Sequence, residues 1–288
     1  IIDLTIGADC NLTCSYCCKE YSTAWRRDVV INGDYANDVR YQATNKDRLL
    51  LKISQPELKY STHYQALLKE IELAAPALKT LVITGGEPLL DNFLFDTLAN
   101  LKMSDQSVIE IYTGLGVGSS RFANIVQKLK QIPNLQIIVS AENTEKFAEF
   151  NRYGIQWQEF MNKINLLKQN NIKIKFHATL TNLTIFGFVQ FYKQFKDEEI
   201  KLTFAYQPDM MAVYVLDYHS KQQLMQDLTL LPEHFSTPLL KSITPDPSEI
   251  QRNNIGNFLK EFVNRRKDLN LNIFPNKFLT WAGLSHVV

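Results

Sequence analysis

The sequence predicts an α/β protein made of six strand–helix units around a parallel sheet. Short apolar runs rich in β-branched residues alternate along the chain with segments whose apolar residues recur every three or four positions. The connections between them are short, which favours right-handed crossovers and parallel strands. Six such units suit either an open doubly wound sheet or a partial barrel, and the periodicity leaves that choice open.

The predicted strands fall into two groups. Four are short and apolar, as expected of strands buried on both faces, and they span residues 2–6, 81–84, 108–112 and 135–139. Two later strands, 172–180 and 200–206, alternate apolar and polar residues instead, which is typical of a sheet with one buried face.

Amphipathic helices are predicted between and after these strands. Their apolar positions span residues 64–71, 90–101, 122–129, 157–167, 186–195, 221–228 and 255–263. Two segments lie outside the pattern. The polar stretch 19–61 has few helix or strand signals, and the Pro-containing stretch 236–247 is interpreted as a linker.

Composition narrows the class of protein. The chain has 288 residues, 45% of them hydrophobic, so it can bury a substantial core and is not globally disordered. Lys and Arg number 31 against 30 Asp and Glu, so no overall field attracts nucleic acid or an anionic membrane, although a local basic patch remains open. The longest apolar run, 210–216, is far shorter than the roughly 20 residues of a membrane span. No signal peptide is predicted, and because the chain begins at Ile1 inside a predicted strand, we expect it to be a portion of something longer.

All four cysteines lie between Cys10 and Cys18. A disulfide framework would spread its bridges through the fold, whereas cysteines clustered in one loop indicate a metal site in a reducing compartment, here the cytoplasm. Cys10, Cys14 and Cys17 form a C-x-x-x-C-x-x-C spacing that can direct three thiolates towards one point. Cys18 directly follows Cys17, so its side chain is expected to point elsewhere.

The number of thiolates bears on the identity of the metal. Thiolates select zinc, copper(I) or iron–sulfur clusters, and a structural zinc normally takes four ligands. In a four-iron cluster held by three cysteines, one iron keeps an open coordination position that can bind another molecule, which suggests a catalytic role. Two alternatives remain at this point: a non-catalytic zinc site completed by a distant histidine, and a set of buried thiols.

A glycine-rich turn follows the second predicted strand. It consists of Gly85, Gly86, Glu87 and Pro88. Glycines allow a backbone to approach a ligand closely. Because this turn and the cysteine loop follow successive parallel strands, both are expected at the carboxyl rim of the sheet, where ligands of α/β folds bind.

The cysteine spacing, with Tyr16 before its last cysteine, and the GGEP turn together resemble the radical S-adenosylmethionine superfamily. The resemblance covers residues 1 to about 210 and implies a partial (β/α)6 TIM-like barrel there, with 211–288 as a small C-terminal extension that has no cysteine. It also implies a 4Fe-4S cluster on Cys10, Cys14 and Cys17. S-adenosylmethionine would bind beside the cluster, near Tyr16, Gly85, Gly86, Glu87 and Pro88.

Enzymes of this superfamily cleave S-adenosylmethionine reductively, and the resulting 5′-deoxyadenosyl radical abstracts hydrogen from a substrate. The resemblance therefore implies an enzyme, while the reaction that follows stays open between oxidoreductase and transferase-like chemistry. The Arg-Tyr-Gly segment at 152–154 and the C-terminal tail also resemble the twitch-domain branch of the superfamily.

Further site residues are suggested by the same resemblance. Ser140, after the fourth strand, and Arg152 correspond to residues that bind the methionine carboxylate and the ribose; an ordinary helix-cap serine and a surface arginine are the alternatives. Glu142 corresponds to an acidic substrate contact and is our catalytic candidate. Thr113 lies in a turn that faces the same rim. Weaker cavity candidates end the last two strands: Thr179, Thr181, Asn182, Tyr206 and Gln207.

A peptide or amino-acid-derived substrate is expected, because the Ser-x-Glu segment and the extension resemble peptide-modifying members. A nucleobase or nucleotide is the second choice. Paired basic residues that could meet phosphate, although such pairs are more often solvated, are Arg26, Arg27, Arg265, Arg266 and Lys267. An electron donor such as flavodoxin or ferredoxin is the expected protein partner, and no membrane is expected.

Overall fold

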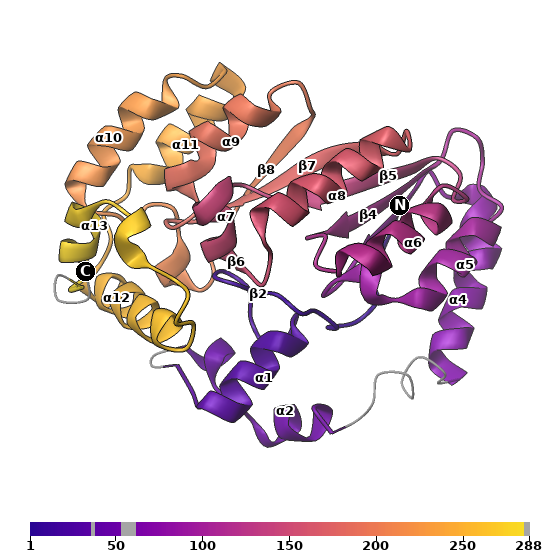
Figure 1. Cartoon of the computed structure of the whole chain (residues 1–288), viewed down its shortest axis with the longest axis horizontal. Coiled ribbons are helices and arrows are strands. Elements are labelled where there is room, and N and C mark those ends of the chain that lie inside the picture. Colours follow the sequence, from indigo (N-terminus) through magenta and orange to yellow (C-terminus); the bar gives the residue numbers. More distant parts are fainter. Residues whose placement is uncertain (36–37, 53–61, 285–288) are drawn as a thin grey trace.

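The computed structural model describes residues 1–35, 38–52 and 62–284 (Figure 1). All six predicted strands are present and pair in parallel, in the order β1-β3-β4-β5-β7-β8. The sheet curls into a partial barrel, as predicted. The strands span β1 Ile2–Thr5, β3 Thr80–Thr84, β4 Val108–Thr113, β5 Leu135–Ser140, β7 Lys173–Leu180 and β8 Ile200–Phe204.

The expectation that the early strands are buried on both faces is wrong for β1, β3 and β4. Only Leu4 is buried in β1. In β3 and β4, buried residues alternate with half-buried ones, as they do along β7. The buried set, which includes Ile83, Ile111 and Phe176, lies in the apolar core. The other set, which includes Thr84 and Tyr112, stays partly accessible because a half-barrel does not close over its concave face.

The helices between the strands match the sequence periodicity, except α7, which the sequence did not predict. They are α4 Thr62–Ala74, α5 Asn92–Asn100, α6 Ser119–Leu129, α7 Glu145–Asn151, α8 Trp157–Gln169 and α9 Phe188–Phe195. The predicted helix 90–101 starts later than expected, because the Pro88–Leu90 segment forms a 3-10 turn first. Apolar faces of α6, α8 and α9 are buried, as one-sided helices require.

The polar stretch 19–61 is more ordered than the sequence suggested. Helix α1 spans Thr23–Asn32 and α2 spans Asn45–Leu50, while residues 53–61 lie outside the described part. Helix α1 escaped the periodicity because its buried face includes Arg26 beside Trp25 and Val29. Asp47 of α2 pairs with Lys19 (3.0 Å) and with Arg26 (3.5 Å), so charged residues here fill interior positions.

The predicted linker 236–247 is also wrong in its first half. Helix α11 spans Glu233–Ile243, and Phe235, Leu239 and Ile243 bury one face of it despite Pro238 inside the helix. The other C-terminal helices are α10 Tyr218–Leu228, α12 Glu249–Asn264, as predicted, and α13 Asn276–Trp281. One apolar cluster contains side chains from both sides of residue 210.

None of the helices in the described ranges is long and apolar enough to cross a membrane.

We expect Phe176→Ala to lower the free energy of unfolding by about 3–5 kcal/mol, because the ring is fully buried against two rings of α9. Its centroid lies 5.3 Å from Phe191 and 4.4 Å from Phe195. The exposed Lys173→Ala on the same strand is the control and should stay within about 0.5 kcal/mol. Urea unfolding measures both, and equal midpoints would contradict the packing of β7 on α9.

Candidate cofactor site

The cysteine loop leaves β1 and is fixed by a short antiparallel ladder. Strand β2, Thr13–Cys14, pairs with β6, Arg152–Tyr153, so that Thr13 lies opposite Tyr153 and Cys14 opposite Arg152. The indole N–H of Trp25 donates to the carbonyl of Cys14 at 2.9 Å. The loop is therefore held from two sides, by a distant strand and by α1.

Three of the four cysteines line one cavity, as the spacing predicts. Cys10, Cys14 and Cys17 lie around it, whereas Cys18 is buried in the apolar core and is not among the lining residues. Burial raises the pKa of Cys10 to about 12 and that of Cys14 to about 11. Thiolates at these positions therefore need a cation to compensate for their lost hydration.

Within the described residues, no three His, Cys, Asp or Glu side chains form a ligand set for a single metal ion. A four-iron cluster makes a different demand on its ligands, since each thiolate binds its own iron. Three thiols from one loop, one buried and two half-buried, surround one cavity and are a donor set of that kind.

The GGEP turn packs directly on the start of the cysteine loop. The N–H of Gly86 donates to the carbonyl of Gly7 at 2.8 Å, and that of Glu87 donates to Asp9 at 2.6 Å. A Cβ at Gly86 would lie 2.4 Å from the Asp9 carbonyl oxygen. Glycine is thus required at 86 by backbone contact within the protein, which the sequence could not separate from contact with a ligand.

Glu87 organises the neighbouring loop. Its carboxylate accepts hydrogen bonds from the Thr113 hydroxyl (2.6 Å) and from the N–H groups of Leu89 (3.1 Å), Gly114 (3.1 Å) and Gly116 (2.9 Å). Burial raises the pKa of Glu87, while these four donors oppose the shift. Glu87 and Thr113 therefore couple the loops after β3 and β4 at the cavity wall.

Arg152 is not the surface residue that the sequence left open. It is 5% exposed and lines the cavity, with its Nη2 2.8 Å from Oε2 of Glu142 and its guanidinium over the Tyr16 ring. Its Nη1 lies 3.9 Å from the sulfur of Cys14. Its Nε is buried and has no hydrogen-bond partner among the described residues.

Ser140 and Glu142 occupy different environments. Ser140 ends β5 and lines the cavity; it is not a helix cap, because α7 begins at Glu145 with Thr144 at the N-cap position. Glu142 is fully buried behind the wall, where Tyr16 donates to its Oε1 at 3.0 Å and Arg152 to its Oε2.

The cavity brings together most of the residues selected from the sequence. Those that line it are Cys10, Cys14, Tyr16, Cys17, Gly85, Gly86, Glu87, Thr113, Ser140 and Arg152. Glu142 and Pro88 are not lining residues, although both belong to lining segments. Thr179 also lines the cavity; Thr181 and Asn182 are fully buried, Tyr206 is exposed, and Gln207 accepts a hydrogen bond from Arg40.

Several lining residues were not selected from the sequence: Leu12, Tyr21, Thr84 and Tyr112. Tyr112 and Thr84 belong to the accessible face of strands that were expected to be buried on both sides, so the parity that identifies them was overlooked. His177 lies on the same face, in register with Ser140. Its ring packs edge-to-face with the Tyr112 ring, and the two ring centroids are 5.4 Å apart. Burial lowers the pKa of His177 to about 4, so its imidazole is neutral at pH 7.

The paired basic residues do not converge on the cavity. Arg26 pairs with Asp47, and Arg265 and Arg266 both pair with Asp28. Arg27 and Lys267 are exposed, and none of the five residues lines the cavity.

We expect Gly86→Ala to lower the free energy of unfolding by about 3 kcal/mol, because the added methyl group meets a backbone carbonyl that cannot move freely. Gly118→Ala is the control, since its Cβ would meet nothing within 4 Å, and an alanine at this N-cap should cost at most about 1 kcal/mol. Thermal and urea unfolding compare the two. Equal losses would show that the turn does not pack tightly on the cysteine loop.

Comparison with solved structures gives weak overall likeness. A structure of anSMEcpe with bound AdoMet is 14% identical, with a TM-score of 0.44, covering 70% of this chain and 50% of that chain. A complex of anSMEcpe with AdoMet and the Cp18Cys peptide is 15% identical, with a TM-score of 0.47 and coverage of 79% and 58%. TYW1 with a lysine-pyruvate adduct bound is 15% identical, with a TM-score of 0.38 and coverage of 84% and 74%.

The chain spans about half the length of the first of these structures. A comparison with curated proteins gives no match. The family model of the radical SAM superfamily matches residues 4–194, a range that contains the end of β1, the cysteine loop, the GGEP turn and the strands β3, β4, β5 and β7. The chain therefore belongs to the radical SAM superfamily.

Proposed function

We propose that this radical SAM enzyme binds a 4Fe-4S cluster through Cys10, Cys14 and Cys17 and binds S-adenosylmethionine at the same rim of the half-barrel. One observation carries the proposal: the three thiols, the Gly85–Gly86 turn and Arg152 line a single cavity. These groups come from the ends of three different segments, and a shared cavity is what a joint cluster and cofactor site requires.

The residues at this cavity fit both groups. The three thiols are buried or half-buried and their pKa values are raised, so they favour a metal-bound state over a free thiolate. The guanidinium of Arg152 at the cavity wall supplies the positive charge that suits a carboxylate. Backbone at Gly85 and Gly86 provides a wall without side chains.

When bound, the cluster and S-adenosylmethionine supply one-electron cleavage chemistry that produces a hydrogen-abstracting radical. The chain's own residues orient the bound groups and shield them from water. Glu142 neutralises Arg152 and fixes the direction of its guanidinium, while the Tyr16 ring covers one face of it. Leu12 contributes an apolar wall, which helps to exclude water from the site.

Glu142, which the resemblance suggested as a substrate contact, lies behind the cavity wall, so its proposed role is to act through two lining residues. Its two oxygens accept hydrogen bonds from Tyr16 and from Arg152. The carboxylate therefore fixes the direction of two groups that a substrate in the cavity would meet.

A peptide or amino-acid-derived substrate is our proposal for the reacting partner. The support comes from the Ser140–Glu142 segment and the C-terminal extension, which resemble peptide-modifying members, and from the accessible polar face of the sheet beside the cavity. Tyr112, Ser140 and Thr179 provide hydroxyl groups there. A cytoplasmic donor such as flavodoxin or ferredoxin, and a twitch-like extension at 211–288, belong to the same proposal.

The direct test is anaerobic reconstitution with iron and sulfide, followed by reduction in the presence of S-adenosylmethionine. We expect about four irons per chain and release of 5′-deoxyadenosine, which is quantified by liquid chromatography. A fully loaded cluster without cleavage would contradict the proposal. Purified protein that holds zinc, and that S-adenosylmethionine does not perturb, would instead indicate a zinc module.

Alanine at Cys10, Cys14 or Cys17 is expected to abolish assembly of the cluster, because each removes one of the three lining thiols. Cys18→Ala is the matched control: it removes a thiol from the adjacent core position and should leave the iron content largely intact. Iron analysis and the visible absorption of the cluster measure both. Equal loss in the Cys18 variant would overturn the ligand assignment.

A further inference from the structure

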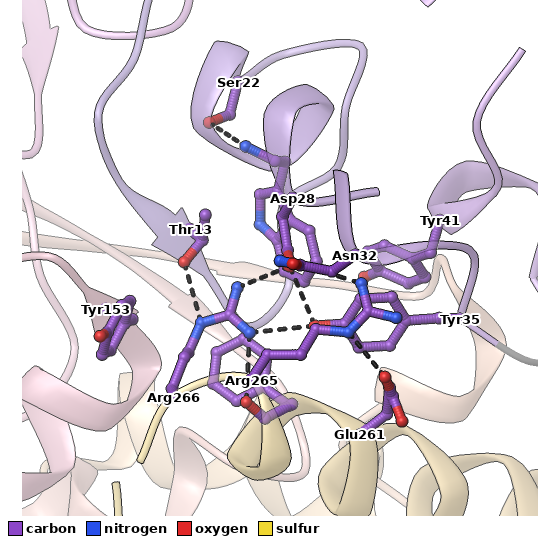
Figure 2. Close-up of polar contacts among 12 residues, drawn as sticks. Thr13, Ser22, Asp28, Asn32, Tyr35, Tyr41, Tyr153, Glu261, Arg265 and Arg266 are labelled. Carbon is purple, nitrogen blue, oxygen red and sulfur yellow. Dashed lines mark hydrogen bonds and ion pairs between the residues drawn. The ribbon is translucent and has the colours of Figure 1, made fainter. Parts of the chain in front are cut away.

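Arg266 follows the last turn of α12 and is buried, with 4% of its surface exposed. Its Nη2 lies 3.0 Å from Oδ2 of Asp28 in α1, and its Nη1 donates to the Tyr35 hydroxyl at 3.0 Å (Figure 2). Nη1 also donates to the carbonyl of Phe262 in its own helix. The C-terminal helix is thereby attached to the segment that follows the cysteine loop.

The same guanidinium also contacts both strands of the β2–β6 ladder. Its Nε donates to the hydroxyl of Thr13 at 3.2 Å, and its carbon lies 5.1 Å from the centre of the Tyr153 ring (Figure 2). Thr13 and Tyr153 are paired in register, and the adjacent pair is Cys14 with Arg152. Arg266 therefore holds the ladder one residue away from two lining residues of the cavity.

Arg266 also contacts Trp25, which bonds to Cys14. The guanidinium of Arg266 lies 5.1 Å from the centre of the Trp25 ring, and the Trp25 indole donates to the Cys14 carbonyl. Cys14 is thus supported through its neighbour Thr13 and through Trp25, and both supports contact the same charged group.

A buried guanidinium suits this task better than apolar packing. It is planar, its donors have fixed directions, and leaving any of them unpaired inside the protein is costly. All three nitrogens of Arg266 have partners, on α1, on β2 and on α12 itself. A shift of the ladder relative to α12 would break these directional bonds. The bonds of Arg266 therefore define one position of the cysteine loop, which apolar packing alone would not do.

We propose that Arg266 is a positioning residue of the cofactor site, which holds the β2–β6 ladder so that the Cys14 thiol and the Arg152 guanidinium face the cavity. The proposal rests on the proposed function for its consequence, a correctly held cluster. It makes the C-terminal extension a part of the site, although the extension contributes no cysteine.

Arg265 provides a matched control. It precedes Arg266, its side chain is similarly buried, and it pairs with the same Asp28 at 3.4 Å. It also contacts Glu261 and the Tyr35 ring (Figure 2). Its remaining bonds are to the carbonyls of Gly33 and Asp34, and among the described residues it makes no hydrogen bond or ion pair with β2 or β6. Loss of either arginine removes a buried cation next to Asp28, but of these two arginines it is Arg266 that bonds to the ladder.

Thr13 allows a finer test within the ladder. Thr13→Val keeps the shape of the side chain and removes the acceptor for Arg266, whereas Thr13→Ser keeps the hydroxyl. The set to compare is Arg266→Gln, Arg265→Gln, Thr13→Val and Thr13→Ser, each in the full chain.

The first readout uses the protein without cluster. Alkylation by iodoacetamide, followed by mass spectrometry of each cysteine, gives the rate at which Cys14 becomes accessible. We expect Arg266→Gln and Thr13→Val to raise that rate about fivefold through loss of a charge-assisted hydrogen bond. Thr13→Ser and Arg265→Gln should stay within about twofold, and Cys18 serves as the internal reference for general loosening.

The second readout uses reconstituted protein. Loss of iron to a chelator should be about tenfold faster in Arg266→Gln and Thr13→Val, as for other residues that orient metal ligands. The electron paramagnetic resonance spectrum of the reduced cluster should change on addition of S-adenosylmethionine less in these two variants than in Thr13→Ser.

Two results would overturn the proposal. One is equal acceleration of Cys14 alkylation in Arg265→Gln and Arg266→Gln, which would reduce Arg266 to a general stabiliser. The other is wild-type alkylation in Thr13→Val. If the wild-type protein assembles no cluster, the proposed function fails, yet the alkylation rates still decide whether Arg266 positions Cys14.

Discussion

The two-residue ladder between β2 and β6 is the constraint on which the cofactor site depends. It places Cys14 opposite Arg152, although 138 residues separate them in the chain. Beside it, Ser15 bonds to Asn151 through both backbone and side chain, and Asn151 bonds to Asn143, which in turn donates to the Thr184 carbonyl. A buried polar chain therefore runs from the cysteine loop to the ends of β5 and β7. Buried bonds of this kind are costly to break, so the rim is set by hydrogen bonds as much as by packing.

Several buried carboxylates in this protein each bind donors from a distant segment of the chain. The carboxylates of Glu87 and Glu142 do not face open solvent; one collects the N–H groups of the next loop, and the other neutralises Arg152. Asp28 is also buried, and it accepts hydrogen bonds from Arg265 and Arg266. Each acidic residue thus holds a different segment of the chain, and the positions of these segments decide which thiols and donors reach the cavity.

The half-open barrel explains the distribution of polar residues on the sheet. One face of β3, β4 and β7 carries the core against the helices, and the other remains accessible with hydroxyl and imidazole groups from Tyr112, Thr179 and His177. A closed barrel would fill this space with apolar side chains. The accessible face lies next to the cavity, which gives a substrate room to approach the site that the cysteine loop provides.

The sequence alone determined the six strands of the main sheet and most of the helices between them, together with the GGEP turn and the three lining cysteines with their bystander Cys18. Local periodicity and spacing are enough for these features because they depend on neighbours in the chain. It could not reveal that Gly86 is required by the Asp9 carbonyl, that Glu142 is occupied by Arg152 and Tyr16, or that Arg266 reaches Thr13. Helix α1 was not predicted because its buried face includes the charged Arg26, and α11 was not predicted because Pro238 lies inside it. These features arise from contacts between segments far apart in sequence, and only the packed chain decides which partner a charged side chain finds.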